Sequence, residues 1–392
     1  MNDLKIGVIG SGGRGRLAAH AHQPDQGSRV VACCDVNAAT LQANREKYGD
    51  VFTTSDYREL LARDLDAVFI TVPDFLHEDY ACAALRAGKA VYLEKPMAIT
   101  TEGCDRILRT AFETKMRLYL GHNMRHMPFV LKMKELIDAG ALGEVKAVWC
   151  RHFVGHGGDF YFRDWHAERR YSTGLLLQKA THDIDVMHWL AGGYSDLVNA
   201  LGGLMVYGDI QDRLPRLSEP RPLARPQIRM EVWPPTAQRE LNADIDVEDL
   251  SLLQMRLDNG VFAAYQQCHF APDYWRNYTV IGTAGRIENF GDGDDGTVVK
   301  LWNRRKRGWA EADEIFETSA TSGGHGGADP RIVAEFLRFV REGSKTNTSP
   351  LAARQSVAAG CAATHSLRHG GIPVAVMPVD AQLANYFENG QA

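Results

Sequence analysis

The chain has 392 residues, of which 45% are hydrophobic and 24% are charged, and its formal net charge is −5. A chain of this length is too long to fold around a single hydrophobic core, so we expect a globular protein of two domains. The net negative charge excludes nucleic acid as an expected partner, and no apolar stretch approaches the roughly 20 residues of a membrane span. Seven cysteines, an odd number without a C-x-x-C pair, are typical of reduced thiols in a cytoplasmic protein without a signal peptide.

The first third of the chain alternates between strand and helix patterns. Strand-like apolar runs lie at residues 4–9, 30–34, 67–72, 90–93 and 117–121. Helical patterns lie at residues 41–48, 57–65, 78–87 and 102–115. Because each gap between strands is long enough for a crossover helix, this alternation predicts a doubly wound, parallel α/β sheet.

A glycine-rich loop, Gly10-Ser11-Gly12-Gly13-Arg14-Gly15, follows the first strand, and Asp35 lies twenty residues after it. Strand, G-x-G-x-x-G, helix, strand and acidic residue in this order form the Rossmann dinucleotide-binding fingerprint. The first glycine permits a tight turn, the second lets backbone N–H groups approach a pyrophosphate, and the third allows close helix packing. The N-terminus of the following helix adds a favourable field for phosphates. We therefore predict a Rossmann domain over residues 1–123.

The residues around Asp35 favour NAD over NADP as the cofactor. The Asp35 carboxylate would accept hydrogen bonds from the adenosine ribose and would repel a 2′-phosphate. Val36 and Asn37 follow, and neither is an arginine that would bind that phosphate, although Arg14 or Arg16 could reach one. The predicted cofactor contacts are Gly10, Gly12, Gly13, Arg14, Gly15, Asp35, Thr71, Pro73, His77, Glu94 and Lys95.

Two segments follow later strands of the same sheet. Thr71-Val72-Pro73-Asp74 lies where it could flank the nicotinamide or its ribose, and His77 begins the next helix, which it could equally well cap. Glu94-Lys95-Pro96 follows the strand at 90–93. A lysine there points into the crevice where a cofactor and a substrate would meet.

The pattern changes after about residue 123. A helix is predicted at residues 128–139, and strands at 145–153, 250–257, 261–270 and 278–281. Asp258-Asn259-Gly260 between two of these strands is a hairpin signal. We expect residues 124–392 to form a second domain, with α+β structure around a large open, mainly antiparallel sheet. A last helix near residues 350–370 could pack back on the first domain.

Residues 174–190 have the pattern of one amphipathic helix, with Gln178, His182 and Asp185 on one stripe and Lys179 beside it. The stripe could be a solvated surface, but the flanking segments are apolar or glycine-rich, which favours a helix packed inside the molecule. A neutral imidazole can remove a hydroxyl proton while hydride leaves the carbinol carbon, and an ammonium can stabilise the developing alkoxide. His182 and Lys95 fit these roles if the two domains face each other across the cofactor.

A polar and aromatic segment precedes this helix. Its candidate substrate contacts are Tyr161, Arg163, Trp165 and His166. Aromatic faces and forked hydrogen bonds suit sugars, although an interface or a structural loop is an equal alternative. We expect no metal site, because the His152-x-x-x-His156 spacing needs a helix, whereas this stretch begins as a strand and passes through Gly157-Gly158.

The glycine loop, Glu94-Lys95-Pro96 and His182-Asp183-x-Asp185 together resemble the Gfo/Idh/MocA family of glucose–fructose oxidoreductase and inositol dehydrogenase-like proteins. The resemblance covers nearly the whole chain. It implies a Rossmann domain and an α/β domain whose open sheet commonly forms a dimer or tetramer interface. It also implies hydride transfer between a nicotinamide cofactor and a secondary alcohol, with Lys95 and His182 as the catalytic residues.

This chain departs from the family at Gln178, where many dehydrogenases carry an aspartate four residues before the histidine. Glutamine cannot ionise, so we expect Lys179 to take part of that role. Residues 323–330 also resemble a family feature near the substrate. Glycines around His325 suit a loop that closes over a ligand, although a helix N-terminus capped by Asp329 is an alternative. Gln178, Asp183 and His325 complete the predicted substrate contacts.

The leading hypothesis is an NAD-dependent dehydrogenase of a sugar, cyclitol or glycoside, active as a homodimer or homotetramer. The alternative is an NAD-dependent glycosidase, as some relatives are, which oxidises a sugar carbon transiently, eliminates the aglycone, adds water and re-reduces the product. A non-catalytic NAD-binding regulator is a third hypothesis, and it is disfavoured because Lys95 and His182 are both present.

Overall fold

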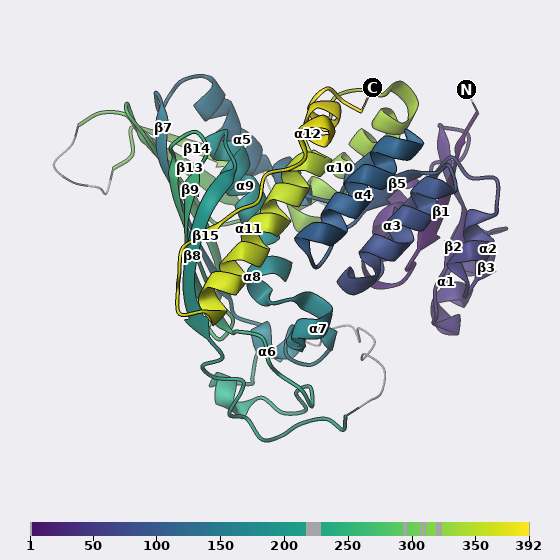
Figure 1. The fold of residues 1–392 in the computed structure, drawn as a ribbon, viewed down its shortest axis with the longest axis horizontal. Helices are drawn as coiled ribbons and strands as arrows, with labels where there is room; N and C mark the ends of the chain where they lie inside the picture. Colours follow the sequence, from purple (N-terminus) through teal and green to yellow (C-terminus); the bar gives the residue numbers. More distant parts are fainter. Residues whose placement is uncertain are drawn as a thin grey trace. The chain divides into compact units, whose positions relative to one another are not determined.

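The computed structural model describes residues 2–216, 229–292, 296–305, 308, 311–318 and 324–391. They form two compact units, coloured along the chain in Figure 1. Unit 1 comprises Met1–His126, Gly327–Arg354 and Val379–Ala392, and unit 2 comprises Met127–Gly326 and Gln355–Pro378. Unit 1 thus contains two C-terminal segments that the sequence analysis assigned to the second domain.

Unit 1 is built on a six-stranded sheet with the order β3-β2-β1-β4-β5-β6. Its strands are β1 (Leu4–Ile9), β2 (Ser28–Cys34), β3 (Phe52–Thr54), β4 (Ala67–Ile70), β5 (Ala90–Leu93) and β6 (Leu118–Leu120). Every neighbouring pair is parallel, which confirms the predicted doubly wound sheet. The sequence analysis missed β3, because three residues are too few to show a periodic pattern.

Helices cover the sheet of unit 1. They are η1 (Gly13–Ala21), α1 (Ala38–Tyr48), α2 (Tyr57–Leu61), η2 (Asp74–Leu76), α3 (His77–Arg86), α4 (Thr101–Thr114), η3 (Asn123–His126) and α12 (Ala381–Glu388), with most of α10 (Gly324–Glu342) and the start of α11 (Pro350–Arg368). The helix after the glycine loop is a run of 3₁₀ turns. Phe336 of α10 packs its ring 5.2 Å from Phe69 and 5.5 Å from Tyr92, so α10 closes the core of this sheet.

Unit 2 is built on a nine-stranded sheet with the order β14-β13-β12-β11-β7-β10-β9-β8-β15. Its strands are β7 (Val145–Val154), β8 (Ser195–Gly203), β9 (Leu250–Leu257), β10 (Phe262–Cys268), β11 (Tyr274–Gly282), β12 (Arg286–Phe290), β13 (Thr297–Trp302), β14 (Glu314–Thr318) and β15 (Val374–Ala375). Strands β7 and β10 pair parallel and the other neighbours pair antiparallel, so the prediction of a mainly antiparallel sheet is confirmed. The predicted hairpin joins β9 to β10, and its Gly260 has a φ of +83°.

The helices of unit 2 include two that pack on this sheet. The unit contains α5 (Pro128–Asp138), α6 (Gly157–Phe160), η4 (Trp165–Ala167), α7 (Arg169–Ser172), α8 (Leu175–Gln178), α9 (Thr181–Ala191), η5 (Pro235–Ala237) and the rest of α11. Helix α9 contacts β7, β10 and β11. Helix α5 contacts β13, β14 and α9, and both helices lie beside the sheet in Figure 1. None of the helices in the described parts of the chain is long and apolar enough to cross a membrane.

The prediction of one continuous helix over residues 174–190 is wrong. Helix α8 ends at Gln178 and α9 begins at Thr181. The N–H groups of Lys179 and Ala180 both donate to the carbonyl of Leu175, so the hydrogen-bond register slips by one residue. Gln178 and His182 are therefore not one regular turn apart, and the argument that places them on a common stripe fails.

All seven cysteines are free thiols. Cys33 and Cys34 end β2, directly before Asp35, and both are buried. Burial raises the pKa of each of these two thiols to about 12.

Candidate active site

The glycine loop is held tightly against the end of β4. Gly10 has a φ of +80°, and a Cβ there would lie 2.8 Å from the carbonyl carbon of Thr71. A Cβ on Gly15 would lie 2.3 Å from the carbonyl oxygen of Gly10, which also accepts a 2.8 Å hydrogen bond from the Thr71 hydroxyl. Only glycine fits at either position, so the close approaches predicted for this loop are present.

The apex of the loop fits a dinucleotide pyrophosphate. A Cβ on Gly13 would meet no described atom within 4 Å, so the backbone there is open to a ligand. Asp35 lies beside it: one carboxylate oxygen accepts from Gly12 N–H at 2.9 Å and the other from Asn37 N–H at 2.9 Å. Each oxygen keeps a further lone pair for a ribose hydroxyl. This arrangement suits NAD, whose ribose carries no 2′-phosphate.

Arg14 is held by two carboxylates of unit 1. Its guanidinium pairs with Glu94 and forms two hydrogen bonds to Asp329 of α10, at 2.6 and 3.0 Å. Asn123 also donates to Asp329, at 3.2 Å. Arg14 is thus neutralised by protein carboxylates, which removes support from the alternative that it binds the 2′-phosphate of NADP. Asp329 lies inside α10, which begins at Gly324, so the expectation that Asp329 caps this helix is wrong.

The segment Glu94-Lys95-Pro96 follows β5 at the carboxyl edge of the sheet. Glu94 accepts a 2.9 Å hydrogen bond from the backbone N–H of Lys95, and the Lys95 side chain is half-buried. The fully buried His77 ring contacts the carbonyl oxygens of Pro96, at 2.7 Å, and Val72, at 2.9 Å. His77 therefore ties the two predicted cofactor segments together, with half-buried Pro73 beside Val72. Direct contacts of Pro73 and His77 with the cofactor stay predictions.

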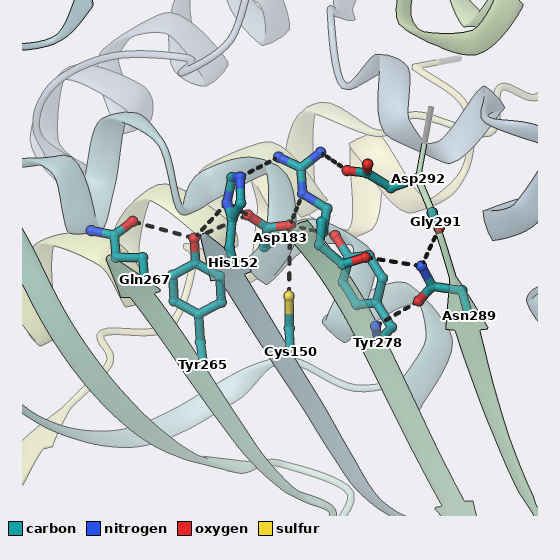
Figure 2. Close-up of polar contacts among 10 residues, drawn as sticks. Cys150, His152, Asp183, Tyr265, Gln267, Tyr278, Asn289, Gly291 and Asp292 are labelled. Atoms are coloured by element: carbon teal, nitrogen blue, oxygen red, sulfur yellow. Dashed lines mark hydrogen bonds and ion pairs between the residues drawn. The ribbon is translucent and has the colours of Figure 1, made fainter. Parts of the chain in front are cut away.

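A network of polar side chains in unit 2 surrounds Asp183, which is fully buried on α9 (Figure 2). Arg276 Nε lies 2.9 Å from Oδ1, and Tyr278 donates its hydroxyl to the same oxygen. His152 Nδ1 lies 3.1 Å and the Tyr265 hydroxyl 3.0 Å from Oδ2. Although burial alone would raise the pKa of Asp183, Arg276 and His152 hold it below its ordinary value.

The same network fixes the tautomer of His152. Arg276 Nη2 donates to Nε2 of the ring at 3.3 Å, so the ring proton is on Nδ1 and is donated to Asp183. Burial, assisted by the Arg276 charge, lowers the pKa of His152 to about 3, and the ring is neutral. Both ring nitrogens are thus engaged within the unit. Among residues with described positions, no three His, Cys, Asp or Glu side chains lie close enough to hold a metal ion.

Several predicted substrate contacts come together around the Tyr161 ring. Lys179 Nζ lies 5.6 Å from its centre, and the His166 ring lies 5.3 Å from it in an edge-on arrangement. His166 stacks on Trp165 at 3.7 Å, and its Nδ1 contacts Asp164 at 2.6 Å. These contacts form an aromatic wall with a cation beside it. Its rings, Tyr161, Trp165 and His166, are buried, and their contact with a substrate stays a prediction.

The remaining predicted residues are more scattered. Arg163 donates to the backbone carbonyl of Arg239 at 2.7 Å. Gln178 ends α8 and His182 lies in the first turn of α9; both are largely buried. His325 is exposed and has a φ of +54°, and Gly323, two residues before it, lies outside the described residues. Lys95 belongs to unit 1 and His182 to unit 2, and their common role in one reaction stays a prediction.

Two residues of this region were not singled out by the sequence analysis. Arg276 lies on the inward side of β11 with Tyr278, where a charged side chain on a buried stripe signals an ion pair. His269 is fully buried, with its ring 5.2 Å from that of Tyr161. Burial, together with His152 and Lys179, lowers the pKa of His269 well below its ordinary value. The sequence signals a buried charge at Arg276, but it does not identify Asp183 as the partner.

The fold and the loop geometry define a dinucleotide-binding α/β protein with a second unit built on a large mixed sheet. Residues 4–122 match the family model described as "Oxidoreductase family, NAD-binding Rossmann fold", and residues 134–376 match "Oxidoreductase family, C-terminal alpha/beta domain". The chain belongs to the Gfo/Idh/MocA family of oxidoreductases. The family and fold class predicted from the sequence are confirmed, as is the NAD-binding character of the first domain.

Three individual proteins show how similar this chain is to named members of the family or fold. YteT of Bacillus subtilis (strain 168), named as an oxidoreductase, is 26% identical over 310 residues, which cover 69% of this chain and 72% of YteT. Inositol 2-dehydrogenase of Salmonella paratyphi B is 33% identical over 188 residues, but the match spans about half of each chain, 47% and 52%. The structure of levoglucosan dehydrogenase in complex with NADH and levoglucosan aligns with a TM-score of 0.76, covering 96% of this chain and 100% of that one. Its sequence identity is 21%, so this likeness shows a shared fold.

Proposed function

We propose that the protein is an NAD-dependent dehydrogenase that moves hydride between nicotinamide and a secondary alcohol of a sugar, cyclitol or glycoside. The observation that carries the proposal lies in unit 1, where Lys95 follows β5 at the same sheet edge as the glycine loop and Asp35. In open α/β sheets this edge is where a cofactor and its substrate meet. The inositol 2-dehydrogenase relative supports a polyol substrate.

In this proposal each ionisable side chain has a separate task. Bound nicotinamide supplies the hydride acceptor, so the carbinol carbon is oxidised to a carbonyl while NAD is reduced to NADH. His182 takes the proton from the substrate hydroxyl as the C–H bond breaks, and the Lys95 ammonium stabilises the negative charge that develops on that oxygen. Lys179, beside Gln178, takes part of the role that an ionisable side chain at position 178 would fill.

The proposed substrate contacts belong to unit 2. The aromatic wall of Tyr161, Trp165 and His166 would pack against the C–H faces of a sugar or cyclitol ring. Arg163, Gln178 and His325 are retained as proposed polar contacts from the sequence analysis. Asp183 was predicted as a contact as well.

A redox-neutral glycosidase is the second candidate function, and Gln178 is the feature that favours it. The enzyme would oxidise a ring hydroxyl, eliminate the aglycone across the adjacent C–H bond, add water and return the hydride. Such a cycle ends with NAD unchanged, so aglycone release without lasting NADH distinguishes it from the dehydrogenase.

We also propose that the protein assembles as a homodimer or homotetramer in the cytoplasm. The free state of all seven cysteines supports a reducing compartment. The support for assembly is the face of the nine-stranded sheet that points away from α9. On it Trp149 is 49%, Leu252 46% and Phe262 64% exposed.

The deciding experiment is an incubation with NAD and a panel of free sugars, inositols and aryl glycosides, with NADH absorbance and aglycone release followed together. NADH should accumulate with a free sugar or cyclitol. The Lys95→Ala variant should lower kcat/KM by roughly 1,000-fold, because alkoxide stabilisation is lost, while the Kd for NAD changes little. Lys47→Ala, which removes a lysine that lies over Tyr48 on α1, is the matched control and should retain full activity. Unchanged turnover in Lys95→Ala, or neither product from any substrate, would overturn the proposal.

A further inference from the structure

Asp183 directly follows His182 in the first turn of α9, and its surroundings differ from those of a substrate ligand. The carboxylate has no exposed surface. Figure 2 shows it enclosed by side chains of three strands: His152 and Cys150 of β7, Tyr265 of β10, and Tyr278 of β11.

The acceptor capacity of this carboxylate is filled by protein donors. A carboxylate offers about four lone-pair directions. The Tyr278 hydroxyl and the Cys150 thiol donate to Oδ1, and His152 Nδ1 and the Tyr265 hydroxyl contact Oδ2. Arg276 Nε adds an ion-pair contact, 2.9 Å from Oδ1. A substrate hydroxyl would have to displace one of these four donors. The geometry therefore argues against the substrate contact that the sequence analysis assigned to Asp183.

Stability alone does not account for the network. A buried ion pair often contributes no more to stability than apolar side chains of the same volume. Arg276 is 6% exposed and also lies 3.2 Å from the half-buried Asp292, so two carboxylates share one guanidinium. The contacts of such a cluster are directional, so they set the position and rotation of the helical turn that carries the carboxylate.

Asp183 lies in the first turn of α9. The residue before this helix is Ala180, and no side chain caps its N-terminus within the described structure. A first turn without a cap frays more readily than one with a cap. The contacts of Asp183 with β7, β10 and β11 tie this turn to the sheet.

We propose that Asp183 is a positioning residue, which anchors the first turn of α9 to β7, β10 and β11 and so fixes the imidazole of His182 for proton transfer. This inference rests on the proposed function, because it presumes that His182 is the base. It replaces a predicted substrate contact by a role that acts through the neighbouring residue.

Two variants separate this role from a merely structural one. Asp183→Asn leaves Arg276 without its full countercharge and should lower the melting temperature. The double variant Asp183→Asn/Arg276→Met removes both charges and should recover most of that loss. In both variants kcat should fall by roughly 100-fold, the cost of a misplacement near 1 Å, while KM changes less than about threefold. With substrate deuterated at the reacting carbon, the isotope effect on kcat should rise, because proton and hydride transfer become rate-limiting.

The control is Asp249→Asn, which alters another fully buried carboxylate of unit 2. Asp249 accepts hydrogen bonds from the backbone N–H groups of residues 205–207, at 2.7 to 3.0 Å. This variant should lower the melting temperature without changing the isotope effect. A double variant that regains full kcat would show a purely structural pair. An Asp183→Asn variant with raised KM and unchanged kcat would restore the substrate-contact assignment.

The wild-type assay keeps the two proposals distinguishable. If the wild type oxidises no substrate, the proposed function fails, and the position of His182 is then read by NMR. The imidazole signals of His182, identified by their loss in His182→Gln, should shift or broaden in Asp183→Asn/Arg276→Met and stay unchanged in Asp249→Asn. Unchanged signals in the double variant would overturn the inference.

Discussion

Asp35 holds a fixed negative charge where the adenosine ribose of the cofactor would lie. Its two oxygens accept backbone hydrogen bonds from Gly12 and Asn37, so the carboxylate cannot swing away from an added 2′-phosphate. We therefore expect this side chain to discriminate between NAD and NADP. The neighbouring Arg14 is bound to Glu94 and Asp329 and offers no compensating charge.

We predict that Asp35→Ser weakens NAD and relieves the repulsion of NADP. Hydrogen bonds to a charged group contribute about 1.5–3 kcal/mol, so KM for NAD should rise roughly 10- to 100-fold, with a smaller change for NADP. Steady-state kinetics with both cofactors measure the ratio of their kcat/KM values. Asp50→Ser, at an exposed position after α1, is the control. An unchanged ratio in Asp35→Ser would place the discrimination elsewhere.

At the scale of single residues, the predictable part of the site is the part that local chemistry fixes. Gly10, Gly15 and Asp35 could be assigned because a turn, a close approach and a strand end recur at fixed spacings. The partner of Arg14 could not be assigned, because Asp329 lies 315 residues away in the chain. Only the fold brings these two side chains together.

At the scale of elements, β7 and the turn that follows it hold two imidazoles, His152 and His156, that stay neutral. The pKa of His152 is lowered to about 3, by burial and then Arg276, and that of His156 to about 4, by burial and then Lys179. In the unfolded chain both rings bind a proton near pH 6.5. Between about pH 6.5 and pH 4 the unfolded state therefore holds more protons, and stability falls as the pH falls.

We predict that the melting temperature declines steadily from pH 7 to pH 5. The depressed carboxyl pKa of Asp183 contributes stability that is lost only at lower pH, so it does not enter this window. His156→Gln should reduce the slope, since one proton fewer is taken up on unfolding. His369→Gln, at an exposed position after α11, should leave the slope unchanged. A melting temperature that is flat or rises toward pH 5 would contradict the assignment of neutral buried rings.

The break between α8 and α9 shows where element prediction from sequence stops. Apolar residues continue at helical spacing through residues 175–190, so periodicity gives one helix. In the fold, Gly360 of α11 packs so closely on α8 that a Cβ there would lie 3.0 Å from the carbonyl oxygen of Leu176. The slipped register at Leu175 is adjacent to this contact. A tertiary contact of such long range has no signature in the local pattern.

At the scale of the whole molecule, the nine-stranded sheet leaves one face with large apolar side chains exposed. Trp149 of β7, Leu252 of β9 and Phe262 of β10 lie on neighbouring strands. Large apolar side chains exposed on one sheet face are typical of an interface. A second copy of the same chain offers a matching sheet face, as a two-fold assembly requires.

We predict that Phe262→Asp shifts the protein toward the monomer. A carboxylate at the centre of an apolar interface loses its hydration without gaining a partner, so association should weaken by at least about tenfold. Sedimentation equilibrium measures the change. Met230→Asp, which alters an 84% exposed methionine outside the sheet, is the control and should keep the wild-type mass. A monomeric wild type, or an unchanged mass in Phe262→Asp, would refute this interface.

The architecture of each unit was more predictable than the membership of its helices. Alternating strands and helices over residues 4–121 require a parallel sheet, and the hairpin at Asp258-Asn259-Gly260 requires an antiparallel pair. The apolar stripe of α10, with Phe336 and Phe339, predicts that one face of this helix is buried against another part of the protein. The sequence of the helix does not say which of the two sheets it packs against, because that depends on the path of the whole chain.

The two adjacent thiols at the end of β2, Cys33 and Cys34, bear on the resistance of the protein to oxidation and alkylation. Peroxides and alkylating agents attack the thiolate form of cysteine, and a thiol with a pKa near 12 carries almost no thiolate at neutral pH. Cys33 and Cys34 lie directly before Asp35, the proposed ribose contact, where an oxidised or alkylated sulfur would displace the carboxylate. We therefore expect burial of these thiols to protect the proposed dinucleotide site from oxidative inactivation.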